Sequence, residues 1–473
     1  MASLLNLFAE AVARHPNRIA IVDGDGRETS FRTLDDHTRT LAARWQKQGV
    51  RHGDRVILAA GISADLYASL AALWSIGATV VLPEPAMGLK GLRHAIRTTK
   101  PRAFCAMGWY IALKYLLPEL WSKMLLRPGS SHCSVSGHGA ADDDIALISF
   151  TSGTTGPPKA IPRSHAFLNE QYKAVAPLLQ SEAVERDLVT FPVFTLVNLA
   201  DGRVSILPNW KMNHLDRLTP GQLGDWLRDQ RITRVLAPPS VCELLAQAPT
   251  PASLTTIFSG GGPVFPDLIS KLSQKTGARV ACIYGSTEAE PIAFLDAADI
   301  SDRDQEQMAQ GHGLLVGSPI PNLNVRIVDD EVQVAGPHVN SSYLDPEKNA
   351  ETKVVEGHLT WHRTGDAGAF DAEGRLWLLG GVGSVVKTAN QTLYPFAIET
   401  AARYWPGVDR SALLERNSLP VLAVQGDASH LTEWSVKAKA LGVEKVSAIA
   451  KIPLDQRHWS KVDRSSLKRL LSL

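Results

Sequence analysis

The segment Phe150 to Lys159, FTSGTTGPPK, combines residue types that suit phosphate binding. Glycines let backbone N–H groups approach phosphate oxygens, hydroxyl groups add donors, and Lys159 adds a positive charge. The Walker pattern is absent, because Lys159 follows two prolines and is not part of Gly-Lys-Ser/Thr. A stretch rich in Gly, Ser and Thr can equally be an exposed turn. The residues that would cradle phosphate are Thr151, Ser152, Gly153, Thr154, Thr155 and Gly156.

Two more segments place polar or glycine residues at the ends of predicted strands. Tyr284 to Glu288, YGSTE, follows the apolar run VACI. Its tyrosine could stack on a base, and its carboxylate could hold Mg²⁺ against phosphates. In SGGGP, which also ends a strand, the bare backbone of Gly260, Gly261 and Gly262 could lie against a flat ligand. Each segment alone could be a turn, but together, at the carboxyl ends of strands, they indicate one nucleotide pocket.

Asp366 and Lys461 are two further candidates with weaker local signals. Asp366 follows WHRTG in a predicted tight loop, where it could accept hydrogen bonds from ribose hydroxyls. A lone aspartate in such a place is more often a turn residue. Lys461, in SKVDR, stands just before a predicted helix. It is either an anion ligand or a surface charge, and composition alone favours the surface charge.

The elements that must position these residues indicate an α/β fold. Across the first two thirds, short apolar runs such as RVILAAG and TRVLAPP alternate with helical patterns, which predicts mostly parallel sheets with helices on their faces. From Asn324 the hairpin patterns VRIVDDEVQVAG and RLWLLGG predict a β-rich subdomain. We therefore expect an N-terminal body over residues 1–380 and a small α+β C-terminal domain over residues 381–473.

Composition excludes some classes of protein. With 49 basic and 48 acidic residues the formal net charge is +1, so we expect no nucleic-acid partner. Four widely spaced cysteines and the lack of a signal-peptide pattern predict a cytoplasmic protein. The most membrane-like stretch, Trp109 to Leu126, contains Lys114, Pro118, Glu119 and Lys123 and predicts no transmembrane segment. We expect a core or surface helix there, with peripheral membrane contact as the alternative.

The ordered series FTSGTTGPPKA, SGGGP, YGSTEAEP, WHRTGD and SKVDR resembles the acyl-adenylate-forming (AMP-binding) superfamily, which includes acyl-CoA synthetases, adenylation domains and luciferases. The resemblance runs across nearly the whole chain. It implies a large body, a small mobile C-terminal domain and an active site at their junction. It also implies that Mg·ATP converts a carboxylic acid into an acyl adenylate and pyrophosphate, without a protein nucleophile.

The resemblance assigns roles to matching positions. The phosphates would be held by the loop Thr151 to Gly156 and Lys159, and adenine would lie among Gly260 to Gly262 and Tyr284 to Ser286. Thr287 would contact the α-phosphate, Glu288 the Mg²⁺ and Asp366 the ribose. Lys461 matches the lysine that bridges the attacking carboxylate and the α-phosphate. The catalytic set is thus Lys159, Thr287, Glu288 and Lys461, with Glu288 as the metal ligand.

The hinge departs from the superfamily pattern. Gly380-Gly381 replaces the usual Gly-Arg, so a charged ribose contact is missing, and the next residues lack the usual hinge aspartate. Lys387 matches a lysine often found just after it. These changes put in doubt the domain rotation that thioester formation needs, and affect activation itself less.

The acid substrate is expected to be hydrophobic. No aspartate suited to hold an amino-acid ammonium group is evident, and the apolar run TFPVFTLV, Thr190 to Val197, would line the acyl pocket. The pocket residues would be Phe191, Phe194 and Thr195. An equally good interpretation is a buried strand without ligand contact.

Several details resemble the olefin β-lactone synthetases and fatty-acyl ligases, among them PAMGLK, TFPVF, AEPI, WHR and RSAL. We expect transfer of the acyl group to a thiol of CoA or of an acyl carrier protein, because that outcome is commoner in the superfamily. The first alternative is ring closure of a β-hydroxyacyl adenylate by its own hydroxyl group. The second is an acyl-adenylate binder with weak activity, against which the retained Lys159, Glu288, Asp366 and Lys461 argue.

Overall fold

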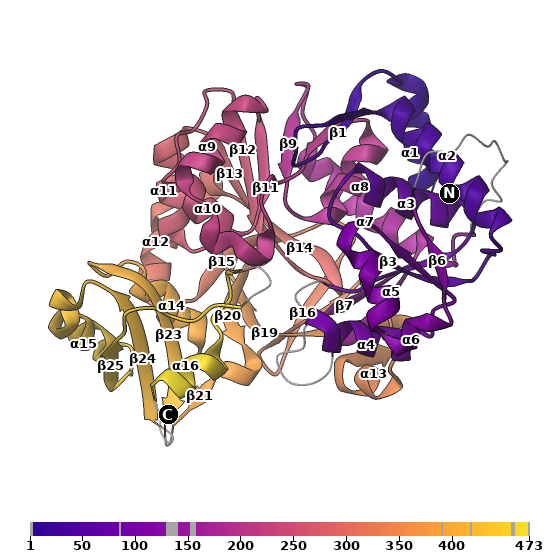
Figure 1. Ribbon diagram of the computed structural model, residues 1–473. Helices are drawn as coiled ribbons and strands as arrows, with labels where there is room; N and C mark the ends of the chain where they lie inside the picture. Colours follow the sequence, from indigo (N-terminus) through magenta and orange to yellow (C-terminus); the bar gives the residue numbers. More distant parts are fainter. Residues whose placement is uncertain are drawn as a thin grey trace.

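The computed structural model describes residues 3–84, 87–128, 141–151, 158–388, 391–416, 419–455 and 459–471. The chain forms two α/β lobes and a smaller C-terminal unit (Figure 1). The α/β class, with a large body and a smaller C-terminal domain, is confirmed. No helix in these ranges is long and apolar enough to cross a bilayer.

The first lobe is built on a six-stranded sheet of order β6-β5-β3-β4-β7-β8. Its strands are parallel except β8, which runs antiparallel to β7. The central strands are almost wholly buried because helices cover both faces. The strands are β3 (Arg55–Ala59), β4 (Thr79–Leu82), β5 (Ala103–Ala106), β6 (Met124–Leu126), β7 (Ile145–Thr151) and β8 (Lys159–Ser164). The surrounding helices include α1 (Leu4–Arg14), α2 (Phe31–Lys47), α3 (Ala64–Ser75), α4 (Gly88–Thr99) and α7 (His165–Val175).

The second lobe contains the parallel half of a larger sheet. Its order, β13-β12-β11-β9-β10-β1, is parallel throughout and delivers the carboxyl ends of these strands to one edge. These strands are β1 (Ile19–Val22), β9 (Arg186–Val189), β10 (Val204–Ile206), β11 (Arg234–Ala237), β12 (Thr256–Gly260) and β13 (Arg279–Ser286), with the short β2 (Glu28–Ser30) antiparallel at the edge. The helices of this lobe are α8 (Pro192–Asp201), α9 (Pro220–Asp229), α10 (Pro239–Leu245) and α11 (Pro266–Thr276).

Beyond β13 the same sheet becomes antiparallel, as the hairpin patterns predict. This part consists of β14 (Ala289–Asp296), β15 (Leu314–Pro319), β16 (Asn324–Val328), β17 (Glu331–Ala335), β18 (Lys353–Glu356), β19 (Leu359–Phe370) and β20 (Leu376–Gly381), with helices α12 (Asp302–Ala309) and α13 (Pro346–Thr352). Its core includes Val332 and Val334 from one face of β17 and Leu376 and Leu378 from one face of β20. This β-rich part adjoins both lobes and the C-terminal domain (Figure 1).

The C-terminal domain has its own three-stranded sheet, β23-β24-β25, and its own apolar core. Its elements are β21 (Val386–Lys387), β22 (Thr392–Leu393), α14 (Pro395–Ala402), β23 (Val408–Arg416), β24 (Leu419–Gly426), α15 (Leu431–Ala440), β25 (Lys445–Ala448) and α16 (Arg464–Leu470). The boundary that we place between residues 380 and 381 lies at the end of β20 and stays a prediction.

Three local predictions are wrong. The run Thr190 to Val197 is not a strand, because Pro192 begins α8 and fixes a helical backbone angle at its first turn. Trp109 to Leu126 is not one helix but a 3-10 turn (Gly108–Ala112), α5 (Leu113–Leu116), α6 (Pro118–Trp121) and β6. Pro118 cannot continue α5, so the chain turns there. Asp366 lies in β19 and not in a tight loop, since Asp366 pairs with Gly381 of β20.

Arg234 on β11 provides a test of how the second lobe is held together. It is almost fully buried, and its guanidinium donates two hydrogen bonds of 2.7 Å to Asp187 of β9 and one to the carbonyl of Leu179. Arg234→Met would leave the Asp187 carboxylate buried without a counter-charge. We expect the free energy of unfolding to fall by about 3 to 5 kcal/mol, measured by urea denaturation. The exposed Arg228→Met, on α9, is the control and should leave the midpoint unchanged; a similar loss in both variants would contradict the assignment.

Candidate active site

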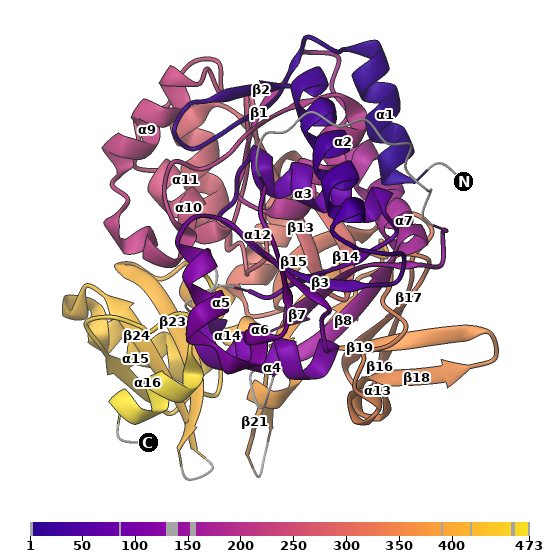
Figure 2. The same cartoon turned by 45° about the vertical axis from the view of Figure 1, so that its right-hand side comes forward.

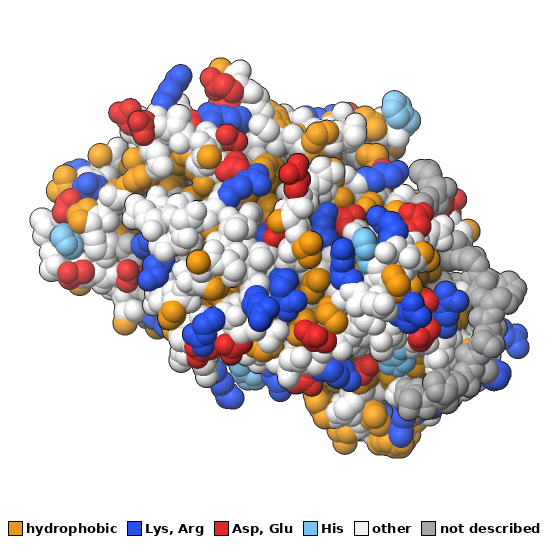
Figure 3. Space-filling model, turned by 90° about the horizontal axis from the view of Figure 1, so that it is seen from above, with side chains coloured by type: hydrophobic (Ala, Val, Ile, Leu, Met, Phe, Trp, Pro, Cys, Tyr) orange, Lys and Arg blue, Asp and Glu red, His pale blue; other side chains and the backbone are white. Residues whose placement is uncertain are grey.

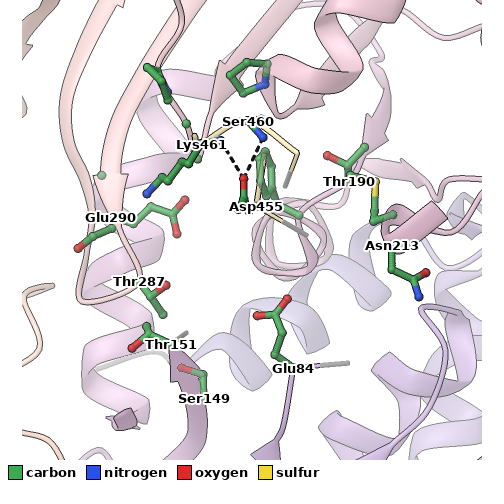
Figure 4. A pocket seen from close by; sticks show the side chains of 18 of the residues that line it. Glu84, Ser149, Thr151, Thr190, Asn213, Thr287, Glu290, Asp455, Ser460 and Lys461 are labelled. Atoms are coloured by element: carbon green, nitrogen blue, oxygen red, sulfur yellow. Dashed lines mark hydrogen bonds between the residues drawn. The ribbon is translucent and has the colours of Figure 1, made fainter. Parts of the chain in front are cut away.

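A deep cleft of about 2870 Å³ lies where the two lobes and the C-terminal domain meet. Figure 4 shows Lys461 reaching into it, with Thr287, Thr151 and Ser149 along one side and Glu84 on its floor. Most of the predicted site residues line this cleft. They are Thr151, Lys159, Gly261, Gly262, Tyr284, Gly285, Ser286, Thr287, Glu288, Phe191, Asp366 and Lys461.

The start and end of the predicted phosphate loop are adjacent. Thr151 at the end of β7 pairs with Lys159 at the start of β8, and both residues line the cleft. The Lys159 ammonium lies 5.3 Å from the ring centroid of Tyr343, a geometry in which a cation is attracted by the aromatic face. Ser152, Gly153, Thr154, Thr155 and Gly156 lie outside the described residues.

Glu288 is held by groups from several distant segments. The hydroxyl of Tyr343 donates to its carboxylate at 2.8 Å, and only 9% of the residue is exposed. Burial alone would raise the pKa of Glu288, but His362, Tyr343 and Lys353 favour its charged form, so the net pKa is lowered. A buried carboxylate that stays ionised near neutral pH is a suitable ligand for a hard cation.

Lys353 and His362 are buried neighbours of this carboxylate that sequence reasoning missed. Burial lowers the pKa of Lys353 to about 8, although Glu288 opposes the change. Burial and the charge of Lys353 lower the pKa of His362 to about 4, so the imidazole is neutral near pH 7. Lys353 also donates to the carbonyl oxygen of Asn340, which fixes its position. No local signal marks these residues, because strands β18 and β19 bring them together.

Arg163 on β8 holds the turn that carries Thr287. Its guanidinium donates to the carbonyl oxygen of Thr287 at 2.5 Å and lies 5.6 Å from the ring centroid of Phe167. Arg163 is buried, and both it and Thr287 lie in the wall of the cleft. Arg163 is separated from Thr287 by 124 positions, and the sequence alone gives no reason to pair them.

Tyr284 and Asp366 belong to the polar side of the cleft, which also carries Thr151 and Thr287 and is called the polar wall below. The tyrosine hydroxyl donates to the Asp366 carboxylate at 2.8 Å. Burial raises the pKa of Asp366 above its ordinary value, while the nearby Lys461 and the Tyr284 hydroxyl oppose that rise. A carboxylate placed beside a flat aromatic ring can accept hydrogen bonds from adjacent hydroxyl groups of a sugar.

The glycines of SGGGP differ in their positions. A side chain at Gly262 would lie 2.6 Å from the Cβ of Ser460, and one at Gly260 would lie 2.5 Å from the carbonyl oxygen of Ile283. Gly261 has a positive φ of 76°, which favours glycine. Gly260 does not line the main cleft but a small cavity behind it, where Phe191 and Phe194 also lie.

The loop that carries Lys461 is fixed by its own aspartate. Asp455 accepts hydrogen bonds from the backbone N–H groups of Ser460 at 3.0 Å and Lys461 at 2.8 Å (Figure 4). The Ser460 hydroxyl in turn accepts from the backbone N–H of Ser240, at the start of α10. The C-terminal domain thereby presents the Lys461 ammonium to the cleft, while the Ser460 hydroxyl connects the loop to the body.

The wall opposite the polar residues is apolar. It is formed by residues from β3, α3, β4, β7 and α8, namely Leu58, Leu66, Tyr67, Leu70, Leu82, Leu147, Phe191, Pro192, Val193 and Leu196. Val193 and Leu196 are three residues apart on α8 and so share its cleft-facing side. Phe194 and Thr195 point elsewhere. Phe194 faces the small rear cavity and Thr195 is wholly buried, so these two predicted pocket residues do not line the cleft.

Charged contacts hold the C-terminal domain against the second lobe. Arg410 of β23 pairs with Glu243 of α10, and Arg403 lies 3.8 Å from Asp267 of α11. The Arg403 guanidinium also lies 4.4 Å from the ring centroid of Phe265. These contacts favour the arrangement in which Lys461 points into the cleft.

The described residues fit a nucleotide with a bound Mg²⁺. The buried hydroxyl oxygens of Ser149 and Ser286 line the cleft without a hydrogen-bond partner, which leaves them available to a polar ligand. Within the described ranges no group of three or more His, Cys, Asp or Glu could hold a metal unaided. A single carboxylate such as Glu288 is sufficient where substrate phosphates supply the other oxygens.

The role of the ion pair between Arg410 and Glu243 can be tested by protease cleavage. The site of cleavage is Lys387, in the segment that follows the body. Glu243→Lys places two cations together and should loosen the C-terminal domain. We expect trypsin to cleave after Lys387 several-fold faster in this variant. Adding Arg410→Glu reverses both charges and should restore resistance; equal cleavage in the single and double variants would contradict the role of the pair.

Comparison with known proteins identifies the family. The chain matches the family described as AMP-binding enzyme over residues 8–341. It is 28% identical to an olefin beta-lactone synthetase of Stenotrophomonas maltophilia, over 92% of this chain and 90% of the relative. It is 27% identical to an olefin beta-lactone synthetase of Xanthomonas campestris, over 99% of this chain and 97% of the relative.

Solved structures share the fold over the whole length. The amide bond synthetase McbA from Marinactinospora thermotolerans superimposes with a TM-score of 0.83 at 22% identity, covering 99% of each chain. O-succinylbenzoate coenzyme A synthetase from Bacillus subtilis in complex with AMP gives a TM-score of 0.80 at 20% identity, covering 98% of each chain. The family match, which spans most of the chain, and the fold lead to one conclusion: this protein belongs to the AMP-binding enzyme family and is an adenylate-forming ligase.

Proposed function

We propose that this enzyme uses Mg·ATP to activate a hydrophobic β-hydroxy acid and then closes the acyl adenylate to a β-lactone. The observation that carries the activation step is the position of Lys461, which enters one cleft together with the polar wall around Thr287 and the apolar wall of α8. A nucleotide on the polar side and an alkyl chain on the apolar side would place the acid carboxylate near the Lys461 ammonium. Burial of the chain would contribute about 0.8 kcal/mol for each CH₂ group.

Different residues would bind different parts of the nucleotide. Thr151, Lys159 and the loop between them would hold the β- and γ-phosphates, and Thr287 the α-phosphate. Asp366 would accept the ribose hydroxyls, while Tyr284 and the glycines of SGGGP would pack around adenine. Glu288 would hold Mg²⁺, which supplies charge neutralisation for the phosphates when it is bound.

Activation is then a matter of position and charge. A carboxylate oxygen attacks the α-phosphorus in line, the bond from that phosphorus to the bridging oxygen breaks, and pyrophosphate leaves. Lys461 would approach both the carboxylate and the α-phosphate, and would reduce the repulsion between two anions. Lys159 would take up charge on the departing pyrophosphate.

Two observations favour ring closure over transfer to a thiol. The two full-length relatives reported above are named olefin beta-lactone synthetases. In addition, the contacts of Arg410 and Arg403 hold the C-terminal domain in the orientation that presents Lys461, and Gly381 lacks the hinge arginine. In ring closure the β-hydroxyl oxygen attacks the carbonyl carbon, the bond from that carbon to the phosphate oxygen breaks, and AMP leaves. The hydroxyl proton passes to solvent, and no second substrate has to enter.

Transfer to CoA or to an acyl carrier protein is the second candidate. Relatives named as acyl-CoA ligases favour it, among them the medium-chain fatty-acid CoA ligase of Escherichia coli, 25% identical over 80% of this chain. This candidate requires the C-terminal domain to leave its contacts with α10 and α11.

Product analysis separates the candidates. Enzyme, Mg·ATP and a panel of fatty, β-hydroxy and aryl acids are incubated with and without CoA, and products are identified by mass spectrometry. We expect AMP and a lactone from β-hydroxy acids without any thiol. A thioester that forms only with CoA would replace ring closure by thiol transfer, and a lack of AMP with every acid would contradict the activation proposal.

Lys461→Ala should lower acid-dependent pyrophosphate release by about 100- to 1000-fold, because one positioned donor in such a site is worth about 3 to 4 kcal/mol. The fold should persist, since the Lys461 side chain makes none of the backbone contacts that anchor its loop. Lys451→Ala, an exposed lysine of the same domain, is the matched control and should retain full activity. Near wild-type release in Lys461→Ala would remove this lysine from the mechanism.

Arg163→Leu should lower the rate of pyrophosphate release by about 10- to 100-fold, because the Thr287 turn loses the hydrogen bond that fixes it. Arg163 lines the cleft, but we expect it to act by positioning Thr287, so the loss should fall mainly on kcat. Arg32→Leu, an exposed arginine of α2, serves as the control. A pure rise in KM for ATP with unchanged kcat would show instead that Arg163 binds the nucleotide directly.

A further inference from the structure

An exposed aromatic platform lies on the first lobe beside the mouth of the cleft. It consists of Trp109, Tyr115, Leu116 and Trp121, whose exposed fractions are between 65% and 69%. These residues lie on the segment of short helices from residue 108 to residue 121, next to α4 (Figure 2). Large apolar side chains rarely gather in this way on a surface that faces only water.

The platform is rigidly supported from beneath. The Lys114 ammonium donates to the carbonyl oxygens of Leu120, Trp121 and Lys123 at 2.5 to 2.7 Å, and thereby ties α5 to α6 and β6. The Trp121 indole N–H donates to the carbonyl oxygen of Tyr115 at 3.0 Å. On the inner side Leu113, Leu117 and Leu120 are buried in the core of the lobe. The outward orientation of the aromatic rings is thus a built feature of the fold.

The same stretch is strongly basic. Residues 87–128 contain eight Lys and Arg and one acidic residue, Glu119, in a chain whose total formal charge is only +1. Glu119 pairs with Arg97 at 3.3 Å and lies 3.7 Å from Arg93, while Lys90 and Arg127 are exposed. By contrast, acidic and basic side chains lie close together on the face shown in Figure 3. The excess of positive charge beside the platform is therefore local.

The platform is continuous with the apolar wall of the cleft. Trp109 of the platform lines the cleft, as do Met87, Leu89, Leu92 and Leu113 of the same region. Leu89 is more than half exposed, so it extends the apolar surface outward at the rim. A hydrophobic acid that leaves a lipid phase at the platform would reach the cleft along apolar side chains.

We propose that the aromatic platform docks on an anionic lipid surface from which the acid substrate enters the cleft. Tryptophan and tyrosine prefer the boundary between headgroups and acyl chains, and nearby lysines and arginines are attracted to anionic headgroups. A second copy of the chain fits less well, because two such basic surfaces would repel each other. The route of the acid rests on the function proposed above; the docking itself does not.

Co-sedimentation with vesicles tests the docking. The intact enzyme is mixed with vesicles of phosphatidylcholine alone or with phosphatidylglycerol added, at low and high salt. The variant Leu116→Ser/Trp121→Ser removes two platform residues that do not line the cleft, and Val355→Ser/Val436→Ser, exposed elsewhere, is the matched control. Lys90→Glu/Arg127→Glu tests the charge, with Lys439→Glu/Lys445→Glu as its control.

We expect the enzyme to bind the anionic vesicles, and we expect this binding to weaken with salt. The affinity for these vesicles should fall at least tenfold in Leu116→Ser/Trp121→Ser and in Lys90→Glu/Arg127→Glu, but in neither control. Absence of binding, or equal binding by platform and control variants, would overturn the proposal. So would concentration-dependent self-association in sedimentation velocity that disappears in the Leu116→Ser/Trp121→Ser variant, because the platform would then be an interface between copies.

Rates of AMP release separate the docking proposal from the proposed activation chemistry. With a short water-soluble acid, Leu116→Ser/Trp121→Ser should release AMP at the wild-type rate. With a long-chain acid presented in anionic vesicles its rate should fall severalfold. Equal rates for the vesicle-borne acid would overturn the entry route, whereas a failure of the wild type to release AMP with any acid would contradict only the activation chemistry.

Discussion

The docking of one loop against the body places Lys461 in the cleft. Lys461 belongs to the C-terminal domain, but the cleft that it enters belongs to the body. Ser460 connects the two, because its hydroxyl accepts from Ser240 of α10 and its Cβ occupies the space that Gly262 leaves open. A side chain at Gly262 would displace the loop, and Lys461 with it. The absence of a Cβ at that position is therefore a requirement for bringing the two parts together as well as for admitting a flat ligand.

Burial also affects the pKa values of the two carboxylates in the polar wall of the cleft. Glu288 is buried and Asp366 is half-buried in the wall of the cleft, yet their pKa values move in opposite directions. Three groups with favourable interactions surround Glu288 and lower its pKa, whereas burial dominates at Asp366 and raises it. The two roles proposed above, cation binding by Glu288 and hydrogen bonding to sugar hydroxyls by Asp366, are consistent with this difference. The partners that produce this difference come from β18, β19 and the segment around Tyr343, which lie far from Glu288 in the sequence.

The sequence predicts the α/β body, the antiparallel extension and the segments that converge on the cleft, because strand periodicity and glycine-rich turns are local signals. Thr287 could be selected for the same reason. Asp366 and Lys461 have weaker local signals and are selected through the resemblance to the superfamily, and Asp366 lies in a strand and not in a loop. Phe194 and Thr195 could not be oriented correctly, since Pro192 converts an apolar run with strand-like composition into a helix, in which residues three apart share a face. The sequence does not predict that Arg163, Lys353 and Tyr343 belong to the site, because only tertiary contacts bring them to Thr287 and Glu288. The loop from Ser152 to Gly156 lies outside the described residues, so its role stays a prediction.

A crystal structure with a non-hydrolysable acyl sulfamoyl adenosine that carries a long 3-hydroxyacyl chain would test the central claim most directly. The account predicts the adenosine beside Tyr284 and Asp366, the alkyl chain along Val193 and Leu196, and the Lys461 ammonium within hydrogen-bond distance of the acyl linkage. The account would be contradicted if the compound bound elsewhere, or if Lys461 lay outside the cleft while the compound occupied it.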